Sequence, residues 1–505
     1  MAVQMMWGQG SEFPEIDLTS DNFYVKENGE GNGSSWKNAM GPKTFAYYLP
    51  QVKDGTTFHV AAGTYYPMYD NDMKLTNDPY AQYTIKSDVT IKGGYPANAA
   101  NGAKSNPKEY KTIFSGDYEN DDVVSFVKEA DGSYSLTYKN YEDNANFLFV
   151  GNTNEINNLV LDGIVLSNSS YYGVYFKTSS QYNSVVNLKA KNVTFENFGN
   201  YAIYSDNVFD FNVNIESSRF KHNSCCIYDY RPKMNIISTV FEENFKGVYT
   251  VYSDNENEKA FLVFDSDTFI GNKGDNVIFT HSELTVKNSI FDSNIKNETG
   301  NNTIINGQEK KITIFNTKFN NNQSPTDLIW GMGNDVVVSN CSFVDNISYQ
   351  IVISENLSVS NSYVYNQQGS LAFYSYDQLT LLSDTIESCK LESRMIQSGN
   401  CRIDSCLIKN NDSYLFYQRG NLDLLNTEIT GNYKTDMDKS MSVIDLLGDE
   451  EDVVNIYNTI FEDNKYKDCV FLKNEGTFSF NFDHCLSDSN ESSQYFDLSN
   501  PKSNI

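Results

Sequence analysis

The sequence is poor in positive charge. Lys and Arg together number 38 against 66 Asp and Glu among 505 residues, and only five Arg are present, so the net charge is −28. A surface with this balance repels nucleic acid and anionic lipid headgroups. It also disfavours a polyanionic glycan unless bound cations intervene. We therefore expect no nucleic-acid partner.

Long apolar runs are missing as well. No stretch of 18 apolar residues occurs, so no transmembrane helix is expected. The last residues, 501–505, follow a copy of the repeat that is itself polar. We predict no direct membrane insertion. The opening segment, Met1–Gly10, reads either as the remainder of a secretory signal with a small-residue cleavage site or as a plain flexible start.

Metal-ligand spacing is absent among the eight Cys. Cys225 and Cys226 are adjacent, and Cys389, Cys401 and Cys406 fall in neighbouring repeats, where other copies carry Ser, Asn or Thr. Buried free thiols are one interpretation of this pattern, and disulfides between neighbouring repeats are the other.

From about residue 157 onwards, the sequence contains fourteen copies of one short repeat motif. Clear copies begin at Asn192, Asn288, Asn316 and Asn458, each with Phe three residues later. We align the copies on their central apolar residue, which gives Val165, Phe195, Phe220, Phe241, Phe269, Phe291, Phe319, Phe343, Val364, Ile386, Leu407, Ile429, Phe461 and Leu486. The steps of 21 to 32 residues are typical of a solenoid.

The repeat favours a parallel β-helix. All fourteen copies carry Asn, Asp or Ser three positions before the central residue, and ten carry Asn three positions after it. Short alternating runs such as Leu284–Val286 precede each phrase and read as strands. Asn tolerates left-handed bends, and stacked Asn amides can hydrogen-bond from coil to coil. The Leu-rich signature of a leucine-rich repeat is missing, and a helical repeat would need a 3.6-residue period.

We therefore predict an all-β, single-stranded right-handed parallel β-helix with an N-terminal cap. The expected organisation is a lead-in or signal remnant at residues 1–21, a cap and first coils at 22–150, and a β-helix of about fourteen coils at 151–505. Within the cap, Phe23–Val25 reads as a strand and Lys43–Val52 as a short helix. A hairpin is expected to pair Val123–Val127 with Ser133–Tyr138.

The cap carries an ordered set of motifs: Tyr24-Val25, the Gly-rich loop 29–35 with Trp36, Val60–Tyr65, Ile91–Tyr95 and Ile113–Asp117. In this order they resemble the N-terminal segment of secreted bacterial right-handed β-helix proteins, especially those of Bacteroidetes. The Phe-x-x-Asn phrase is similar to the repeats of chlamydial polymorphic membrane proteins, which are surface adhesins, although their Gly-Gly-Ala-Ile motif is absent here. The resemblance implies secretion, or display on the surface of a Gram-negative bacterium, and a fold shared by lyases, hydrolases and adhesins.

A Ca²⁺ site would need several oxygen ligands on a flexible loop. Asp117, Glu119, Asp121 and Asp122 are the candidate ligands, although in so acidic a chain such runs arise by chance and solvated surface loops are the favoured interpretation. No other cofactor is expected.

Catalysis on this fold would need paired carboxylates, or a basic residue beside a carboxylate. Candidate residues are Asp229, Arg231 and His222, and a second set is Arg394, Arg402 and Arg419. Because no series of motifs like that of the polygalacturonases is present, a chance polar surface is the competing interpretation.

Tyrosine is abundant, with 35 residues, and several Tyr lie on the strand after each Asn turn. Equivalent positions in stacked coils lie about 4.8 Å apart, so some rings should form an outward column. Sugar rings would suit such a column, whereas β-propensity alone also enriches Tyr. The predicted ligand-binding residues are Tyr228, Tyr230, Tyr249, Tyr252, Trp330, Tyr374 and Tyr376.

Together these observations favour a secreted or cell-surface β-helix, a monomer that is adhesin-like or binds a glycan without catalysis. The alternative is a polysaccharide lyase or glycoside hydrolase acting in a groove along the β-helix, and a structural spacer is the third option.

Overall fold

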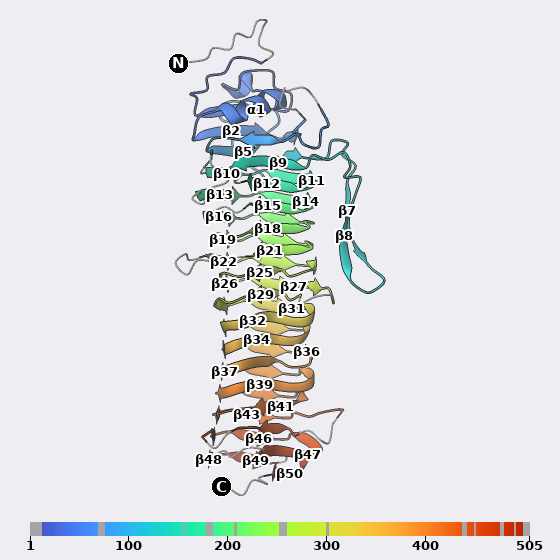
Figure 1. Cartoon of the computed structure of the whole chain (residues 1–505), viewed down its shortest axis with the longest axis vertical. Helices are drawn as coiled ribbons and strands as arrows, with labels where there is room; N and C mark the ends of the chain where they lie inside the picture. Colours follow the sequence, from blue (N-terminus) through green and yellow to red (C-terminus); the bar gives the residue numbers. More distant parts are fainter. Residues whose placement is uncertain are drawn as a thin grey trace. The chain divides into compact units, whose positions relative to one another are not determined.

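The computed structural model describes residues 13–68, 76–153, 155–156, 158–177, 185–206, 210–251, 260–298, 302–436, 442–448, 451–474, 479–488 and 491–497. The fold is all-β, with 58% strand and 3% helix, and parallel sheets form a β-solenoid of about 12 turns (Figure 1). The predicted fold class is therefore confirmed. The chain divides into two compact units, residues 1–125 with 137–230 and residues 126–136 with 231–505.

Each coil contributes a strand to each of three parallel faces. In the first unit, face 1 comprises β1 (Asn22–Val25), β2 (Thr56–Ala61), β5 (Val89–Tyr95), β10 (Asn158–Asp162), β13 (Val185–Lys191) and β16 (Asp210–Glu216). Face 2 comprises β3 (Gly63–Tyr65), β6 (Thr112–Ser115), β11 (Val165–Ser169), β14 (Thr194–Phe198) and β17 (Arg219–Lys221). Face 3 comprises β4 (Tyr83–Ile85), β9 (Phe147–Asn152), β12 (Tyr172–Lys177), β15 (Tyr201–Ser205) and β18 (Cys225–Asp229).

The cap has the elements that its sequence predicts. The helix α1 (Pro42–Tyr48) carries Pro at its first position, and the 3-10 turn η2 (Leu49–Gln51) continues it; a second 3-10 turn, η1, spans Trp36–Asn38. The predicted hairpin is present as β7 (Val123–Lys128) and β8 (Tyr134–Lys139), which form a two-stranded sheet of their own.

The second unit repeats the three faces. Face 1 comprises β19 (Pro232–Ile237), β22 (Phe261–Asp265), β26 (Glu283–Lys287), β30 (Ile312–Phe315), β42 (Leu422–Leu425), β45 (Val453–Tyr457) and β48 (Ser479–Asp483). Face 3 comprises β21 (Lys246–Thr250), β25 (Ile278–Thr280), β29 (Ile305–Gly307), β41 (Asp412–Gln418), β44 (Ile444–Leu446), β47 (Lys465–Asn474) and β50 (Glu491–Asp497). Four long strands run from face 3 into face 1: β32 (Gln323–Ser339), β34 (Ile347–Ser360), β37 (Phe373–Leu382) and β39 (Lys390–Asp404).

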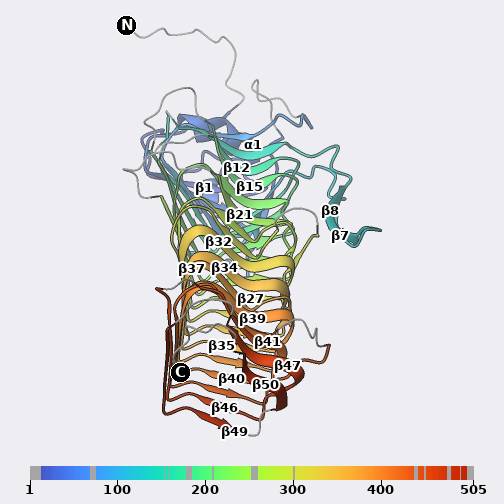
Figure 2. The ribbon, with the colours of Figure 1, turned by 60° about the horizontal axis from the view of Figure 1, so that its bottom comes forward.

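Face 2 of the second unit is made of three-residue strands, and Figure 2 shows several of them stacked one upon another. They are β20 (Val240–Glu242), β23 (Thr268–Ile270), β27 (Ile290–Asp292), β31 (Lys318–Asn320), β33 (Ser342–Val344), β35 (Tyr363–Tyr365), β38 (Thr385–Glu387), β40 (Leu407–Lys409), β43 (Glu428–Thr430), β46 (Ile460–Glu462) and β49 (Leu486–Asp488).

In the three-residue strands of face 2 from β17 to β46, the middle residue is buried in the core. Phe291, Phe319 and Phe343 are fully buried, and their ring centroids lie 4.8 and 4.9 Å apart, with interplanar angles of 6° and 9°. The first unit has the same arrangement at Phe195 and Phe220, 4.7 Å apart. The predicted aromatic stack is therefore confirmed, and it occurs because parallel pairing places the same repeat position in register from coil to coil.

Three copies of the repeat were aligned one residue out of register. Leu166, not Val165, lies opposite Phe195, and Ile408, not Leu407, lies opposite Ile386. In the last copy Ser487 lies opposite Phe461, and Leu486 faces outwards with 51% of its surface exposed. Two adjacent apolar residues made the first two copies ambiguous, and in the last copy Ser487 takes the position where an apolar residue was expected. A slip of one residue moves a side chain to the other side of a strand.

The two bends that flank each face 2 strand are left-handed. Residues three positions before the central residue have φ near +50°, as at Asn288, Asn316 and Asn340. In the corrected copies this position is Gly163, Ser405 or His484. Residues two positions after the centre, such as Asn321 and Asn410, are left-handed too. Asn and Gly suit these bends because they adopt positive φ at low cost.

The residue three positions after the centre forms the predicted internal ladder. Asn322 is fully buried, and its Oδ1 accepts hydrogen bonds from the backbone N–H of Asn294 at 3.1 Å and from the Nδ2 of Asn294 at 2.9 Å. Its own Nδ2 donates to the carbonyl oxygen of Phe291 at 2.9 Å. The same pattern links Asn244, Asn272, Asn294, Asn322 and Asn346, and separately Asn411, Asn432 and Asn464.

A second ladder, which the sequence analysis missed, lies at the other bend. The residue two positions before the centre points inwards, and its side-chain oxygen accepts a hydrogen bond from the backbone N–H of the equivalent residue in the preceding coil. Examples are Ser289 accepting from Asp267 and Thr317 accepting from Ser289. The signal was present in the sequence, because most copies carry Ser, Thr, Asp or Cys at this position.

The described cysteines agree with the first of the two interpretations, free thiols, and not with disulfides between neighbouring repeats. Within the described part of the chain all seven Cys are free thiols; Cys485 is exposed and the other six are buried. Cys341 and Cys406 occupy the second ladder, and Cys389 occupies the Asn position of the first. These thiols therefore replace small polar side chains in the core.

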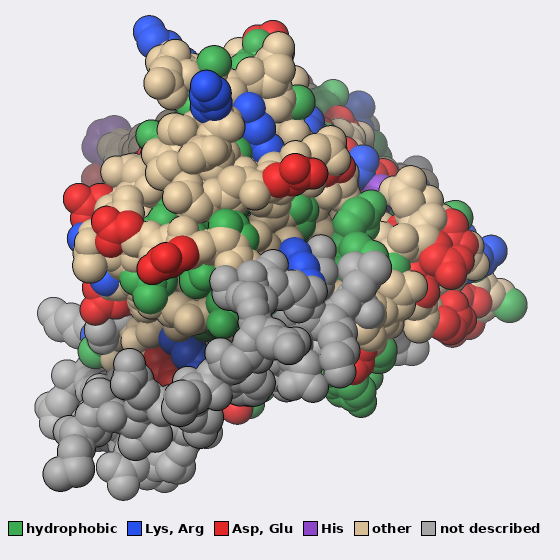
Figure 3. Space-filling model, turned by 90° about the horizontal axis from the view of Figure 1, so that it is seen from above, with side chains coloured by type: hydrophobic (Ala, Val, Ile, Leu, Met, Phe, Trp, Pro, Cys, Tyr) green, Lys and Arg blue, Asp and Glu red, His purple; other side chains and the backbone are tan. Residues whose placement is uncertain are grey.

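The surface is polar and mixed. On the face drawn in Figure 3, carboxylates gather in several separate groups among uncharged polar side chains, with Lys and Arg between them. In the described residues no helix is long and apolar enough to cross a membrane.

Candidate functional site

Aromatic side chains cover the outer side of face 3 in the first unit. Parallel register places Phe147, Tyr172 and Tyr201 in one column and Tyr175, Tyr204 and Tyr228 in the next. We call this group, with its neighbours, the tyrosine patch; its members are Phe147, Tyr171, Tyr172, Tyr175, Tyr201, Tyr204, Tyr228 and Tyr230. Tyr171 is 48% exposed and the others are half-buried.

The rings of the tyrosine patch stack on one another. Tyr172 and Tyr204 have centroids 5.0 Å apart at an interplanar angle of 27°, and Tyr201 and Tyr204 are 5.1 Å apart at 15°. Rings stacked at this spacing cover each other's faces, so the patch presents mainly ring edges and hydroxyl groups to solvent. Other pairs are tilted: Tyr172 lies at 57° to Tyr175, and Tyr228 lies at 48° to Tyr201 and 46° to Tyr204.

The hydroxyl groups in the patch are neutral. Burial raises the pKa of Tyr175 and of Tyr201 to about 12, with a smaller contribution from the charge of Asp206 at Tyr175. Burial and the neighbouring Tyr230 raise the pKa of Tyr204 and Tyr228 as well. A protonated phenol both donates and accepts a hydrogen bond, as a sugar hydroxyl does. The patch is therefore a dense row of neutral donors and acceptors beside an apolar surface.

The predicted residues of the second unit lie in one column of face 3 but do not form a continuous patch. Pairing runs from Tyr249 through Phe279 and Asn306 to Trp330, and from there through Ile353 to Tyr374. Aromatic contacts in this column are pairs: Tyr249 with Phe279 at 5.3 Å, and Tyr374 with the 45% exposed Tyr376 at 4.7 Å. Tyr252 lies outside the described residues.

Of the candidate catalytic residues, Asp229 does not lie on the surface. Asp229 is fully buried and contacts the hydroxyl of Ser205, so it faces the core. His222 is a left-handed bend residue whose carbonyl oxygen accepts a hydrogen bond from the hydroxyl of Tyr138. Arg231 is half-buried at the start of the second unit. Burial thus removes Asp229 from contact with any substrate on the surface.

In the second candidate set, Arg394 and Arg402 form ion pairs. Arg419 lies over the Tyr417 ring. Arg394 is 6% exposed, pairs with Asp445 and donates to the carbonyl oxygens of Phe416 and Ser442.

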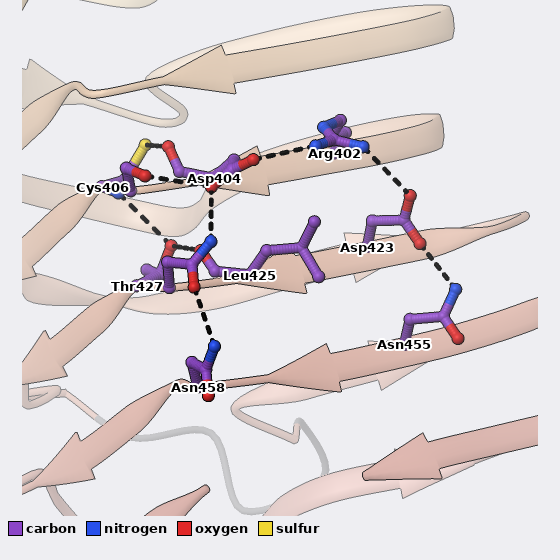
Figure 4. A network of polar contacts seen from close by, with 10 residues as sticks. Arg402, Asp404, Cys406, Asp423, Leu425, Thr427, Asn455 and Asn458 are labelled. Carbon is purple, nitrogen blue, oxygen red and sulfur yellow. Dashed lines mark hydrogen bonds and ion pairs between the residues drawn. The ribbon is translucent and has the colours of Figure 1, made fainter. Parts of the chain in front are cut away.

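Arg402 is more exposed and pairs with Asp404 at 2.8 Å and Asp423 at 3.9 Å, in a polar network that Figure 4 shows crossing several coils. In the same network Asn455 donates to Asp423. These contacts link neighbouring coils and so stabilise the solenoid.

The second unit contains a groove of about 420 Å³ beside β32, β34 and β37. Its polar lining residues are Lys311, Asp335, Asn356, Ser358, Asp377, Gln378 and Thr380. Asn356 lies between the coils that carry the two carboxylates, and its Nδ2 donates to Asp335 at 2.9 Å. Two carboxylates two coils apart in an open groove are an arrangement that could act on a glycosidic bond.

Three of the four predicted metal ligands are brought together. Asp117, Asp121 and Asp122 are joined by Asp143, so that one carboxylate oxygen from each lies within 4.8 Å of the others. Glu119 is not in the group; its backbone N–H donates to Asp143 instead. Asp143 joins the group because β7 and β8 form a hairpin. The start of β7, just after Asp122, therefore lies near the end of β8, just before Asp143.

No protein-family model matches the chain, and no curated protein sequence does. Among solved structures, a PL6 alginate lyase complex with trisaccharide aligns with 90% of this chain and 87% of its own at 10% identity and a TM-score of 0.32. A thermostable GH87 α-1,3-glucanase from Streptomyces thermodiastaticus aligns with 96% of this chain and 69% of its own, at 9% identity and a TM-score of 0.28. A mannuronic acid specific family 6 lyase from human gut microbiota aligns at 11% identity and a TM-score of 0.27, covering 87% and 86%. These neighbours are polysaccharide lyases and a glycoside hydrolase, and at such scores their activities are not carried over to this chain.

Proposed function

We propose that this protein binds a carbohydrate through the tyrosine patch, without catalysis, as an adhesin-like protein outside the cell of a Gram-negative bacterium. The observation that carries the proposal is the continuous row of eight aromatic side chains on one outer face. β-Propensity explains Tyr on strands but does not explain why consecutive coils place their rings against one another. A sugar chain laid along the row would meet phenol hydroxyls and ring edges at a spacing near that of the coils.

The ligand we propose is neutral or weakly charged. The net charge of −28 repels a polyanion, and the patch itself consists of neutral groups. Binding should therefore change little with salt, whereas the attraction of an ion-pair mechanism is screened beyond about 8 Å at physiological ionic strength. Glycan-array screening followed by titration calorimetry at low and high salt tests this point. Affinity that falls steeply with salt would count against the proposal.

Substitutions in the patch locate the site. Tyr204 contacts Tyr172, Tyr175, Tyr201 and Tyr228, so Tyr204→Ala should lower affinity about tenfold, or ~1.4 kcal/mol, whereas Tyr204→Phe keeps the ring and isolates the hydroxyl. The matched control is Tyr349→Ala, a 53% exposed tyrosine of the second unit that lies outside the patch. Melting curves of each variant separate lost binding from lost folding. If Trp330→Ala weakens binding and Tyr204→Ala does not, the ligand occupies the second unit instead.

A second candidate function, a polysaccharide lyase or glycoside hydrolase, is favoured by the groove with Asp335 and Asp377. Under that proposal the wild type releases reducing ends, or unsaturated sugars, from a polysaccharide panel. Asp335→Asn and Asp377→Asn each abolish the release, while Glu355→Gln, which removes one charge from an exposed residue outside the groove lining, does not. A wild type that binds glycans but leaves them intact rules this function out for those glycans.

A further inference from the structure

Four carboxylates of the first unit converge where the chain enters and leaves the hairpin. Asp117 follows β6, Asp121 and Asp122 precede β7, and Asp143 follows β8. Oxygens chosen one from each lie within 4.8 Å of one another. Like charges at this separation repel, so the group needs a compensating positive charge or a bound proton.

One member of the group is already fixed by backbone donors. Asp117 is 3% exposed, and its Oδ1 accepts from the N–H of Asn120 at 2.5 Å and of Asp121 at 3.3 Å. Its Oδ2 accepts from the N–H of Asp122 at 3.2 Å. Asp117 therefore holds the loop that presents the other carboxylates, and this loop geometry alone would be compatible with an acidic turn that binds nothing.

Two buried oxygens of the site have no donor among the described residues. The side chain of Asn144 is 1% exposed, and its Nδ2 donates to Asp122 at 2.8 Å, which places the carboxamide against the carboxylates. Its Oδ1 is buried and accepts no hydrogen bond, and the same holds for Oδ1 of Asp122. Buried acceptors in folded proteins nearly always have a donor or a cation. Two of them beside an excess of negative charge indicate a cation.

The electrostatics of Asp122 agree with this geometry. Burial, together with the charges of Asp117 and Asp143, raises the pKa of Asp122 to about 7, against hydrogen bonds from Asn144 and Asn168 that lower it.

We propose that Asp121, Asp122, Asp143 and the Oδ1 of Asn144 bind one Ca²⁺ ion, with Asp117 positioning the loop. All available ligand atoms are oxygens, and they come from two loop segments, which suits the variable geometry of Ca²⁺ better than the strict octahedron of Mg²⁺. His and Cys, the ligands of softer metals, are absent from the group. The ion ties the entry of the hairpin to its exit.

Titration calorimetry of the full chain, first stripped with EDTA, tests the site with CaCl₂ and with MgCl₂ at equal ionic strength. The expected result is one saturable Ca²⁺ site, at least tenfold weaker Mg²⁺ binding, and a higher melting temperature with Ca²⁺. Asp143→Asn should weaken Ca²⁺ binding at least tenfold. Glu142→Gln removes the same charge from the neighbouring exposed residue and should leave the affinity unchanged.

A second variant distinguishes a ligand from a structural acceptor. Without Ca²⁺, Asp122→Asn should melt no lower than the wild type, because it relieves repulsion, and it should lose the rise in melting temperature that Ca²⁺ gives the wild type. Absence of saturable binding overturns the proposal. Equal losses in Asp143→Asn and Glu142→Gln also overturn it, because they show a diffuse attraction of cations to an acidic surface.

Discussion

Asparagine occurs at two kinds of position in each coil, and the two differ in physical role. Asn316 lies at a left-handed bend with φ of 50°, and its exposed Nδ2 donates to Asn288 at 2.7 Å. Asn322 is fully buried and joins three coils through its amide. The sequence phrase does not distinguish the two, because both appear as a turn residue next to a strand.

Substitution at these two positions should separate backbone from side-chain effects. Asn322→Leu leaves the N–H and Nδ2 of Asn294 without their acceptor and should lower the free energy of unfolding by about 2–3 kcal/mol. Asn316→Leu should cost about 1–2 kcal/mol, because Leu is strained at positive φ, and Asn316→Gly should restore stability. Denaturant unfolding of the three variants measures this. Equal costs for Asn316→Leu and Asn316→Gly would show that the exposed hydrogen bond matters instead.

Two carboxyls occupy the second ladder in place of hydroxyls. Burial raises the pKa of Asp267 to about 8 and that of Asp384 to about 7. The unfolded pKa of each is 3.8, so between pH 4 and pH 8 the folded state holds a proton that the unfolded state has lost. Each group therefore makes stability fall as pH rises through this window.

The pH dependence can be removed by restoring the common residue of the ladder. Asp267→Ser should melt at about the wild-type temperature near pH 4 and above it near pH 8, with the difference growing steadily between these values. Melting curves at a series of pH values, compared with Glu283→Gln at an exposed carboxylate of the following coil, provide the measurement. A difference between wild type and Asp267→Ser that stays constant with pH would mean that Asp267 is ionised in the folded state.

At the scale of the element, the unit of stability is the contact between the same strand in successive coils. Phe319 stacks on Phe291 and on Phe343 and has no exposed surface. Phe319→Ala should cost about 3–5 kcal/mol, as truncation of a buried aromatic side chain does. Phe319→Leu keeps most of the volume and should cost much less. The two variants, followed by thermal unfolding, test the stack; equal melting temperatures for Phe319→Ala and the wild type would contradict it.

The strands show which features of the fold can be predicted from the sequence alone. The Phe column was predictable because one residue type recurs at one position. The slips at Val165 and Leu407 arose where the next residue was equally apolar, and the slip at Leu486 arose because Ser487 occupies the position opposite Phe461. The orientation of the tyrosine rings was not predictable, since it depends on how bulky side chains fill the space between coils. Asp143 was missed because it lies 21 residues after Asp122 and meets it only when the hairpin closes.

At the scale of the whole molecule, the dominant property is the net charge of −28. Self-repulsion of this size destabilises the folded chain at low ionic strength and is screened by salt. The melting temperature should therefore rise by several degrees between 10 mM and 500 mM NaCl, and scanning calorimetry measures it. NaCl and choline chloride should act alike if screening is the cause; an effect of one salt only would indicate a specific ion site.

The ladders also determine how this protein can change in length. Successive coils repeat the same kinds of position, a left-handed bend, an inward polar side chain and an apolar core residue, so neighbouring coils make similar contacts. Removing the 21 residues 342–362 would bring Cys341 next to Tyr363 and leave Val364 in the place of Phe343. Removing 20 or 22 would shift the register by one residue at the junction between the two coils. We therefore expect such a protein to gain or lose whole coils during evolution, while the outward-facing residues of each coil remain free to vary.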